Sequence, residues 1–208
     1  MPFSVTERRE EIMNRYSLRN LLFLTICCDL GLFSKRLIAP AANILTDFMR
    51  IPGGIGTSFS LMFIVVAAEL VPIFGCATLM SIIQSMIALS LGMVGSMGIL
   101  SPIGYIVPGM VIDLIFLLSR KTDLGTDLTL TLANMFGAAA ASLTANLIVF
   151  HLPGVPLALY VVVALASGAV CGCFAGVLAK RLRPVISASS ADGLEEPSIP
   201  AANQAPKN

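Results

Sequence analysis

Long, uninterrupted apolar stretches are the feature that most constrains this chain. Two of them read LTLTLANMFGAAAASLTANLIVF at 128–150 and LALYVVVALASGAVCGCFAGVLA at 157–179. A bilayer core about 30 Å thick needs roughly 20 apolar residues per helix. Both stretches reach that length, and neither shows the alternation of a membrane β-strand. They predict membrane-spanning α-helices.

The composition supports a membrane protein over a soluble one. Of the 208 residues, 56% are hydrophobic and only 12% are charged, and the mean hydropathy is +0.89. A soluble domain carries about 25% charged residues. The formal net charge of +1 gives no broadly basic surface for nucleic acid.

Further apolar stretches, separated by Gly- and Pro-rich breakers, complete a predicted six-helix, all-α membrane bundle. The predicted helices cover 18–33, 56–73, 75–92, 100–119, 128–150 and 157–179. We expect a cytoplasmic N-terminal arm at 1–16, a membrane domain at 17–183, and a disordered cytoplasmic tail at 184–208. The tail is rich in Pro, Ser and Ala and buries too little apolar surface to fold.

The distribution of Lys and Arg predicts the orientation of the bundle, because cytoplasmic loops carry the excess of these residues. Six spans place ten of the thirteen on one side: Arg8, Arg9, Arg15, Arg19, Arg120, Lys121, Lys180, Arg181, Arg183 and Lys207. Both termini are therefore expected in the cytoplasm, in a multi-pass protein of the cell membrane. The other three, Lys35, Arg36 and Arg50, fall in a predicted external loop at 34–54.

The three external cations have two interpretations. They are either interfacial residues that reach lipid head groups or members of a loop that grips a ligand. The second interpretation gains support from the nearby Asn43 and from the PGG at 52–54, where the backbone can approach a ligand closely.

Several polar residues lie inside the predicted spans. Glu69, Gln84 and Asp113 are the most costly of these to place among apolar residues, so each needs a partner or a cavity. We predict Gln84 and Tyr105 as cavity contacts and Ser96 as a contact from the 95–101 loop. Structural hydrogen bonds between helices are the alternative.

The sequence lacks the patterns of an enzyme. It contains no GxSxG, HExxH or Walker A motif, and the cysteines of CGC at 171–173 lack metal-site spacing. We therefore expect no catalytic residues, no metal and no cofactor. Active transport by this chain would draw energy from another subunit or from an ion gradient.

Two segments carry a family resemblance. LGLFSKRLIAPAANILTDFMRIPGG at 30–54 and MVGSMGILSPIGYIVPGMVIDLIFLL at 93–118 resemble S components of energy-coupling factor (ECF) transporters, closest to the thiamine or hydroxymethylpyrimidine group. The resemblance covers roughly 18–118. It implies a six-helix subunit that captures a vitamin-like molecule at its outer face and docks on a membrane scaffold driven by two ATPases.

The resemblance also implies particular residues. Lys35, Arg36, Asn43 and Arg50 would contact the ligand from the first loop, and Ser96 from the 95–101 loop. The family's small-residue docking stripe matches Cys27 and Gly31 here, which are small but not alanine. The scarcity of aromatic and outer acidic residues argues against thiamine itself and leaves the substrate open.

Two other functions remain possible on the sequence alone. A stand-alone secondary transporter would use Glu69 and Asp113 as proton or ion sites. A membrane enzyme or a scaffold without its own ligand is the third possibility, and an enzyme would need a catalytic constellation that the sequence does not show.

Overall fold

The computed structural model describes residues 18–49, 55–71, 73–92, 98, 100–122, 124–150 and 154–192. Within these residues the fold is helical, with no strand. The helices are α2 (Leu18–Met49), α3 (Ile55–Leu70), α4 (Cys76–Ser90), α5 (Ser101–Thr122), α6 (Thr126–Ala145) and α7 (Gly154–Asp192), with a short π-helical turn, η2 (Asn146–Phe150), between α6 and α7. The all-α class is confirmed.

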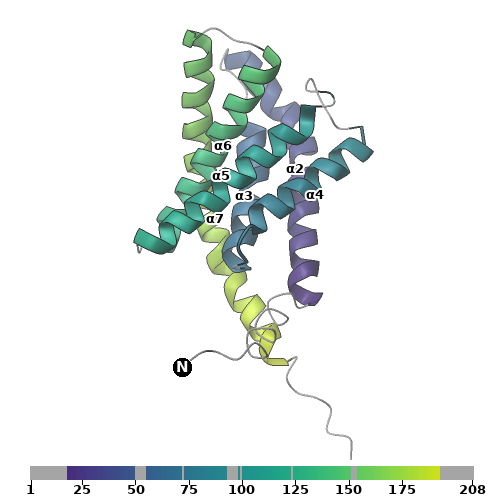
Figure 1. Ribbon diagram of the computed structural model, residues 1–208, viewed down its shortest axis with the longest axis vertical. Helices are drawn as coiled ribbons and strands as arrows, with labels where there is room; N and C mark the ends of the chain where they lie inside the picture. The colour runs from purple at the N-terminus through teal and green to yellow at the C-terminus, as the bar shows by residue number, and fades with distance from the viewer. Residues whose placement is uncertain are drawn as a thin grey trace, which may run out of the picture.

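Helix α3 is the centre of the bundle. It packs against α2, α4, α5, α6 and α7, which surround it. Four consecutive residues, 64–67, are almost completely buried, as expected for a helix that is apolar all round and enclosed by others. In Figure 1, α2 and α7 run along the long axis of the molecule, and α4 and α5 cross it obliquely.

Two outer surfaces remain apolar. The outward faces of α5 and α7 expose large hydrophobic side chains: Met110, Leu114, Leu118, Leu159, Val162, Val170, Phe174 and Val177. A soluble monomer rarely exposes continuous apolar surface of this extent. These faces suit contact with lipid.

Three helical segments are long and apolar enough to cross a membrane: Ser101–Thr122, Thr126–Ile148 and Gly154–Pro184. The apolar helices α3 and α4 have 16 and 15 residues. At 1.5 Å per residue they are about 24 and 22 Å long, short of a 30 Å bilayer core. The described residues form six α-helices, and three of them support a membrane protein; the prediction of six membrane spans stays a prediction.

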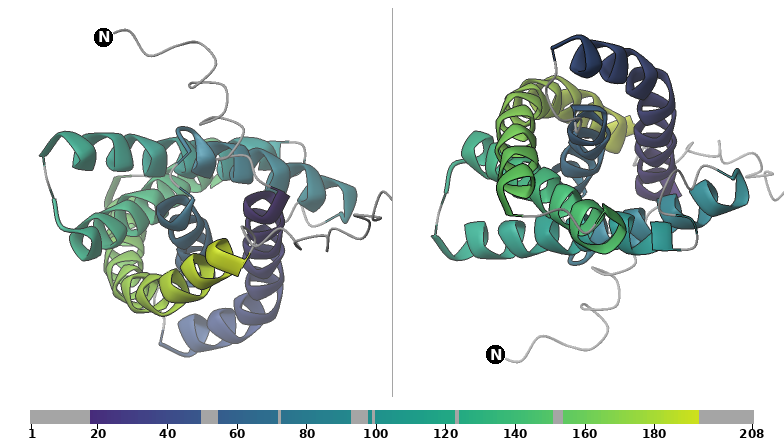
Figure 2. Two further views of the ribbon diagram at one scale, coloured as in Figure 1. Left: turned by 90° about the horizontal axis from the view of Figure 1, so that it is seen from below. Right: turned by 90° about the horizontal axis from the view of Figure 1, so that it is seen from above.

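The predicted external loop at 34–54 is wrong over most of its length. Helix α2 continues through Lys35 and Pro40 to Met49. Its outer part carries apolar residues at helical spacing: Leu37, Ala41 and Ile44. A proline inside a helix can bend the helix without ending it. Figure 2 shows the end of α2 curving over one end of the bundle.

The predicted start of the disordered tail at 184 is also wrong. Helix α7 passes through Pro184 and ends at Asp192. The residues directly after Pro184 include Val, Ile and Ala, which continue a helix more readily than the Pro-rich remainder of the tail. The composition averaged over the whole tail does not show this difference. Residues 193–208, like the predicted arm at 1–16, lie outside the described part of the chain.

Candidate ligand-binding site

Three of the predicted binding residues meet in one cavity. Lys35 from α2, Gln84 from α4 and Tyr105 from α5 line it together, and α3 forms the remaining wall. We call it the inner cavity, and its lining residues are Lys35, Thr57, Ser60, Leu61, Ile64, Gln84, Gly104, Tyr105 and Pro108. Apolar residues surround this small polar centre, as in most ligand sites.

Hydrogen bonds from side chains to α2 carbonyls hold the floor of the inner cavity. Gln84, only 1% exposed, donates its amide Nε2 to the Cys28 carbonyl at 3.1 Å. Ser60 donates its hydroxyl to the Gly31 carbonyl at 2.8 Å. These two bonds fix α3 and α4 against the same turn of α2.

The rim of the inner cavity carries a cation–π contact. The Lys35 Nζ atom lies 4.2 Å from the centre of the Tyr105 ring. An ammonium group at that distance is attracted to the negative face of the ring. The pair joins α2 to α5 across the cavity, and it presents a cation and an aromatic ring at one place.

The inner cavity is small in this conformation. Its volume is about 10 Å³, which is close to the space that one water needs. Sites for drug-sized ligands measure about 300–1,000 Å³. A vitamin-sized molecule would therefore fit only in an enlarged form of the cavity.

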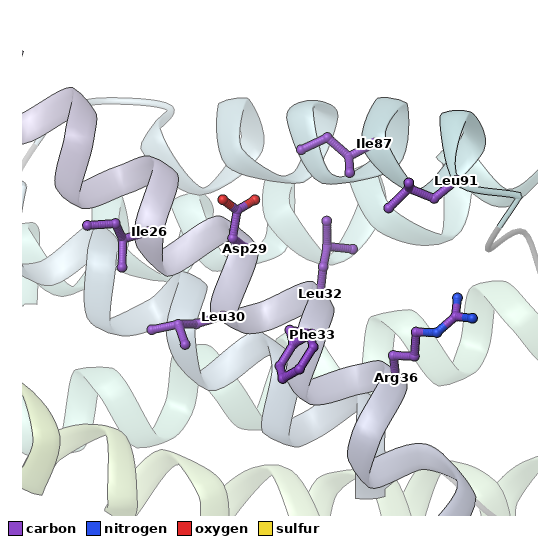
Figure 3. Close-up of a pocket in the computed structure, with 8 residues that line it drawn as sticks. All are labelled: Ile26, Asp29, Leu30, Leu32, Phe33, Arg36, Ile87 and Leu91. Carbon is purple, nitrogen blue, oxygen red and sulfur yellow. The ribbon is translucent and has the colours of Figure 1, made fainter.

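A larger hollow lies on the other side of α2, between α2 and α4. We call it the α2–α4 groove. Its volume is about 790 Å³. Its walls are Ile26, Asp29, Leu30, Leu32, Phe33, Arg36, Ile87 and Leu91, and Figure 3 shows Asp29 and Arg36 separated along α2, with Leu32 and Phe33 between them.

The structure separates the remaining predicted contacts. Arg36 lines the α2–α4 groove and not the inner cavity, because it follows Lys35 by one residue on the helix. Asn43 belongs to the outer part of α2. The Asn43 side chain, Arg50 and Ser96 lie outside what the structure describes, so their predicted roles stay predictions.

The predicted docking stripe faces inward. Cys27 is 4% exposed, and Gly31 is buried. A Cβ added to Gly31 would lie 2.7 Å from the Gln84 amide nitrogen and 3.3 Å from the Ser60 carbonyl oxygen, so glycine leaves room there for the Gln84 side chain and for α3. Both residues pack within the chain, and their role in docking stays a prediction.

A second small-residue stripe, on α7, also packs inside the bundle. Gly168 and Gly172 face the backbone of α6 at Met135 and Thr131, and Gly176 faces the Asp127 side chain. Interhelical packing within the chain accounts for these positions.

Glu69 and Asp113, two of the acids in the predicted spans, have partners that the sequence did not reveal. The Asp113 carboxylate accepts hydrogen bonds from the Ala77 amide at 3.1 Å, the Thr78 amide at 2.8 Å and the Thr78 hydroxyl at 2.6 Å. It therefore caps the N-terminus of α4 from a neighbouring helix.

Glu69, at the end of α3, accepts a hydrogen bond from the Arg183 guanidinium at 2.7 Å. The predicted span at 157–179 ends four residues before Arg183. The actual partner comes from α7, which extends past that boundary.

Sequence reasoning missed several site residues. Ser60 and Thr57 line the inner cavity, and neither stands out among the many hydroxyl residues of the chain. Asp29 and Phe33 line the α2–α4 groove together with Arg36. The seven-residue spacing of Asp29 and Arg36, which places both on one helix face, was the available signal.

No protein-family model, characterised protein or solved structure matches this chain.

Proposed function

We propose that this chain is the substrate-capture subunit of an ECF-type ABC importer. It binds a vitamin or related small molecule at its outer face and delivers it inward when docked on a scaffold subunit powered by two separate ATPases. The six helices form the membrane domain, in which the short α3 is enclosed by its neighbours, and both termini lie in the cytoplasm.

The observation that carries the proposal is the meeting of Lys35, Gln84 and Tyr105 in the inner cavity. These residues come from three different helices. The sequence predicted Gln84 and Tyr105 as cavity contacts inside apolar spans, where polar groups are costly, and Lys35 as a ligand contact from the external loop. A cation beside an aromatic ring and an amide suits a ligand with a carboxylate, a phosphate or an electron-rich ring. On this proposal, ligand entry separates Lys35 from Tyr105 and enlarges the cavity.

The ion-coupled alternative has less support. It relies on Glu69 and Asp113 as ion sites, and the carboxylates of both residues are engaged by the protein. Asp113 holds the first turn of α4, and Glu69 pairs with Arg183. Such contacts explain the acids as structural groups.

Uptake by cells tests the proposal. Cells expressing the chain alone, or together with a scaffold and two ATPases, are supplied with a panel of labelled vitamins and vitamin precursors. We expect uptake of one compound that requires active ATPases and persists when a protonophore collapses the proton gradient. Uptake by the chain alone that stops with the protonophore would contradict the proposal and favour the ion-coupled transporter.

A further inference from the structure

The α2–α4 groove carries two opposite charges at separate positions along mostly apolar walls. Asp29 and Arg36 both line it, and both are exposed. Within the described part of the chain, neither side chain takes part in a hydrogen bond or an ion pair. Their seven-residue separation on one helix corresponds to about 10 Å.

The rest of the groove is apolar. Leu32 lies at its floor at 5% exposed, and Phe33 stands on its edge at 62% exposed. Ile87 of α4 and Leu91, directly after α4, line its other side. A charged side chain forms a strong, charge-assisted hydrogen bond when it meets an opposite charge. An occupant with a suitable group at each end could form one such bond with Asp29 and one with Arg36.

We propose that the α2–α4 groove binds an elongated amphiphile with an ammonium or other strong donor at one end, a carboxylate or similar anion at the other, and an apolar body between. The donor end pairs with Asp29, the anionic end with Arg36, and the body lies against Leu32 and Phe33. The groove volume of about 790 Å³ is within the range of small-molecule sites.

The arrangement of charges distinguishes this ligand from a phospholipid. A phospholipid carries its charges together in one head group. Pairing that head group with Arg36 would leave Asp29 against acyl chains, and pairing it with Asp29 would leave Arg36 there. The groove matches a molecule with charges at two ends. This inference does not depend on the transport proposal, since it concerns binding by the chain alone at a different site.

The probe for the test is 8-aminooctanoic acid, whose amine and carboxylate lie about 10 Å apart when the chain is extended. Its affinity for the purified full-length protein in nanodiscs is measured by isothermal titration calorimetry, with protein-free nanodiscs as the blank. We expect saturable binding, reduced about tenfold or more in Asp29→Asn and in Arg36→Gln, because each loses a charge-assisted hydrogen bond. Asp127→Asn is the matched control, since Asp127 pairs with Lys180 elsewhere on the molecule.

A charge-swapped double variant, Asp29→Arg with Arg36→Asp, controls for the possibility that a single variant loses binding because it is less stable. We expect it to recover most of the affinity, because the probe can bind in the reverse direction. Octanoic acid, which has only the anion, should lose affinity with Arg36→Gln and be indifferent to Asp29→Asn.

Three results would overturn the inference. The first is the absence of probe binding above the blank. The second is equal binding by the wild type and both single variants. The third is a dimer in light scattering that dissociates on Phe33→Asp while the probe fails to bind, which would assign the groove to a second copy of the chain.

Discussion

The contact between Asp113 and the start of α4 gives a prediction that separates a structural acid from an ion-coupling acid. The substitution Asp113→Asn keeps the shape of the side chain but removes its charge, and it turns one acceptor oxygen into a donating NH₂ group. The wild-type carboxylate accepts three hydrogen bonds, from the Ala77 amide, the Thr78 amide and the Thr78 hydroxyl. The asparagine side chain has only one oxygen that can accept these hydrogen bonds.

The expected loss of stability is about 2–3 kcal/mol, because a hydrogen bond to a charged group contributes about 1.5–3 kcal/mol and one acceptor remains. Thr78→Val removes only the hydroxyl bond to the same carboxylate and should cost about 1.5 kcal/mol, the lower end of that range. The double variant should be more stable than the sum of the two losses predicts, because the two residues share one interaction.

The assay is denaturant or thermal unfolding of the purified protein in detergent. Asp29→Asn serves as the control, since Asp29 is exposed and has no ion pair within the described residues; its effect should stay within about 0.5 kcal/mol. An Asp113→Asn protein as stable as the wild type, with transport that no longer responds to an ion gradient, would refute the reasoning and make Asp113 a coupling group.

Two further predictions concern packing and the Glu69 ion pair. Gly172→Ala should destabilise the protein by about 1–3 kcal/mol, because a Cβ there would lie 2.6 Å from the Thr131 Cα. Gly176→Ala should be neutral or slightly stabilising, because its Cβ meets only the flexible Asp127 carboxylate at 3.2 Å. Equal unfolding midpoints for the two variants would contradict this account of the α6–α7 contact. Arg183→Gln should lower the free energy of unfolding by about 1 kcal/mol, since the Arg183 side chain is 60% exposed but that of Glu69 only 16%. This loss should be smaller in a Glu69→Gln background. An unfolding midpoint unchanged by Arg183→Gln alone would show that the pair contributes nothing.

The positions of the helices could be predicted because the signals for them are local. Each apolar stretch is bounded by nearby breakers such as Gly75 and the LPG at 152–154, and the structure begins or ends helices close to them. The outer part of α2 was not predicted, because its charged residues and Pro40 are typical of a loop. The helical spacing of Leu37, Ala41 and Ile44 was the signal for the helix.

The partners of the polar residues could not be predicted, because they depend on which helix faces meet. Thr78 and Asp113 are 35 residues apart, and Glu69 and Arg183 are 114 apart. Gln84 and Tyr105 were selected as polar residues in apolar spans, and Lys35 as a cation of the predicted loop. Only the packing of α2, α4 and α5 shows that the three share a cavity. The α2–α4 groove depends in the same way on where α4 leaves α2 uncovered.

The central claim is that this chain alone captures a small molecule through Lys35 and Tyr105. The most direct test is native mass spectrometry of the detergent-purified protein after incubation with a pooled panel of vitamins and vitamin precursors. We predict one compound retained at one copy per chain. Lys35→Met and Tyr105→Leu should lose it, while the matched variants Lys180→Met and Tyr160→Leu, on α7, should keep it. Retention of no compound from the panel, or equal retention by all four variants, would contradict the claim.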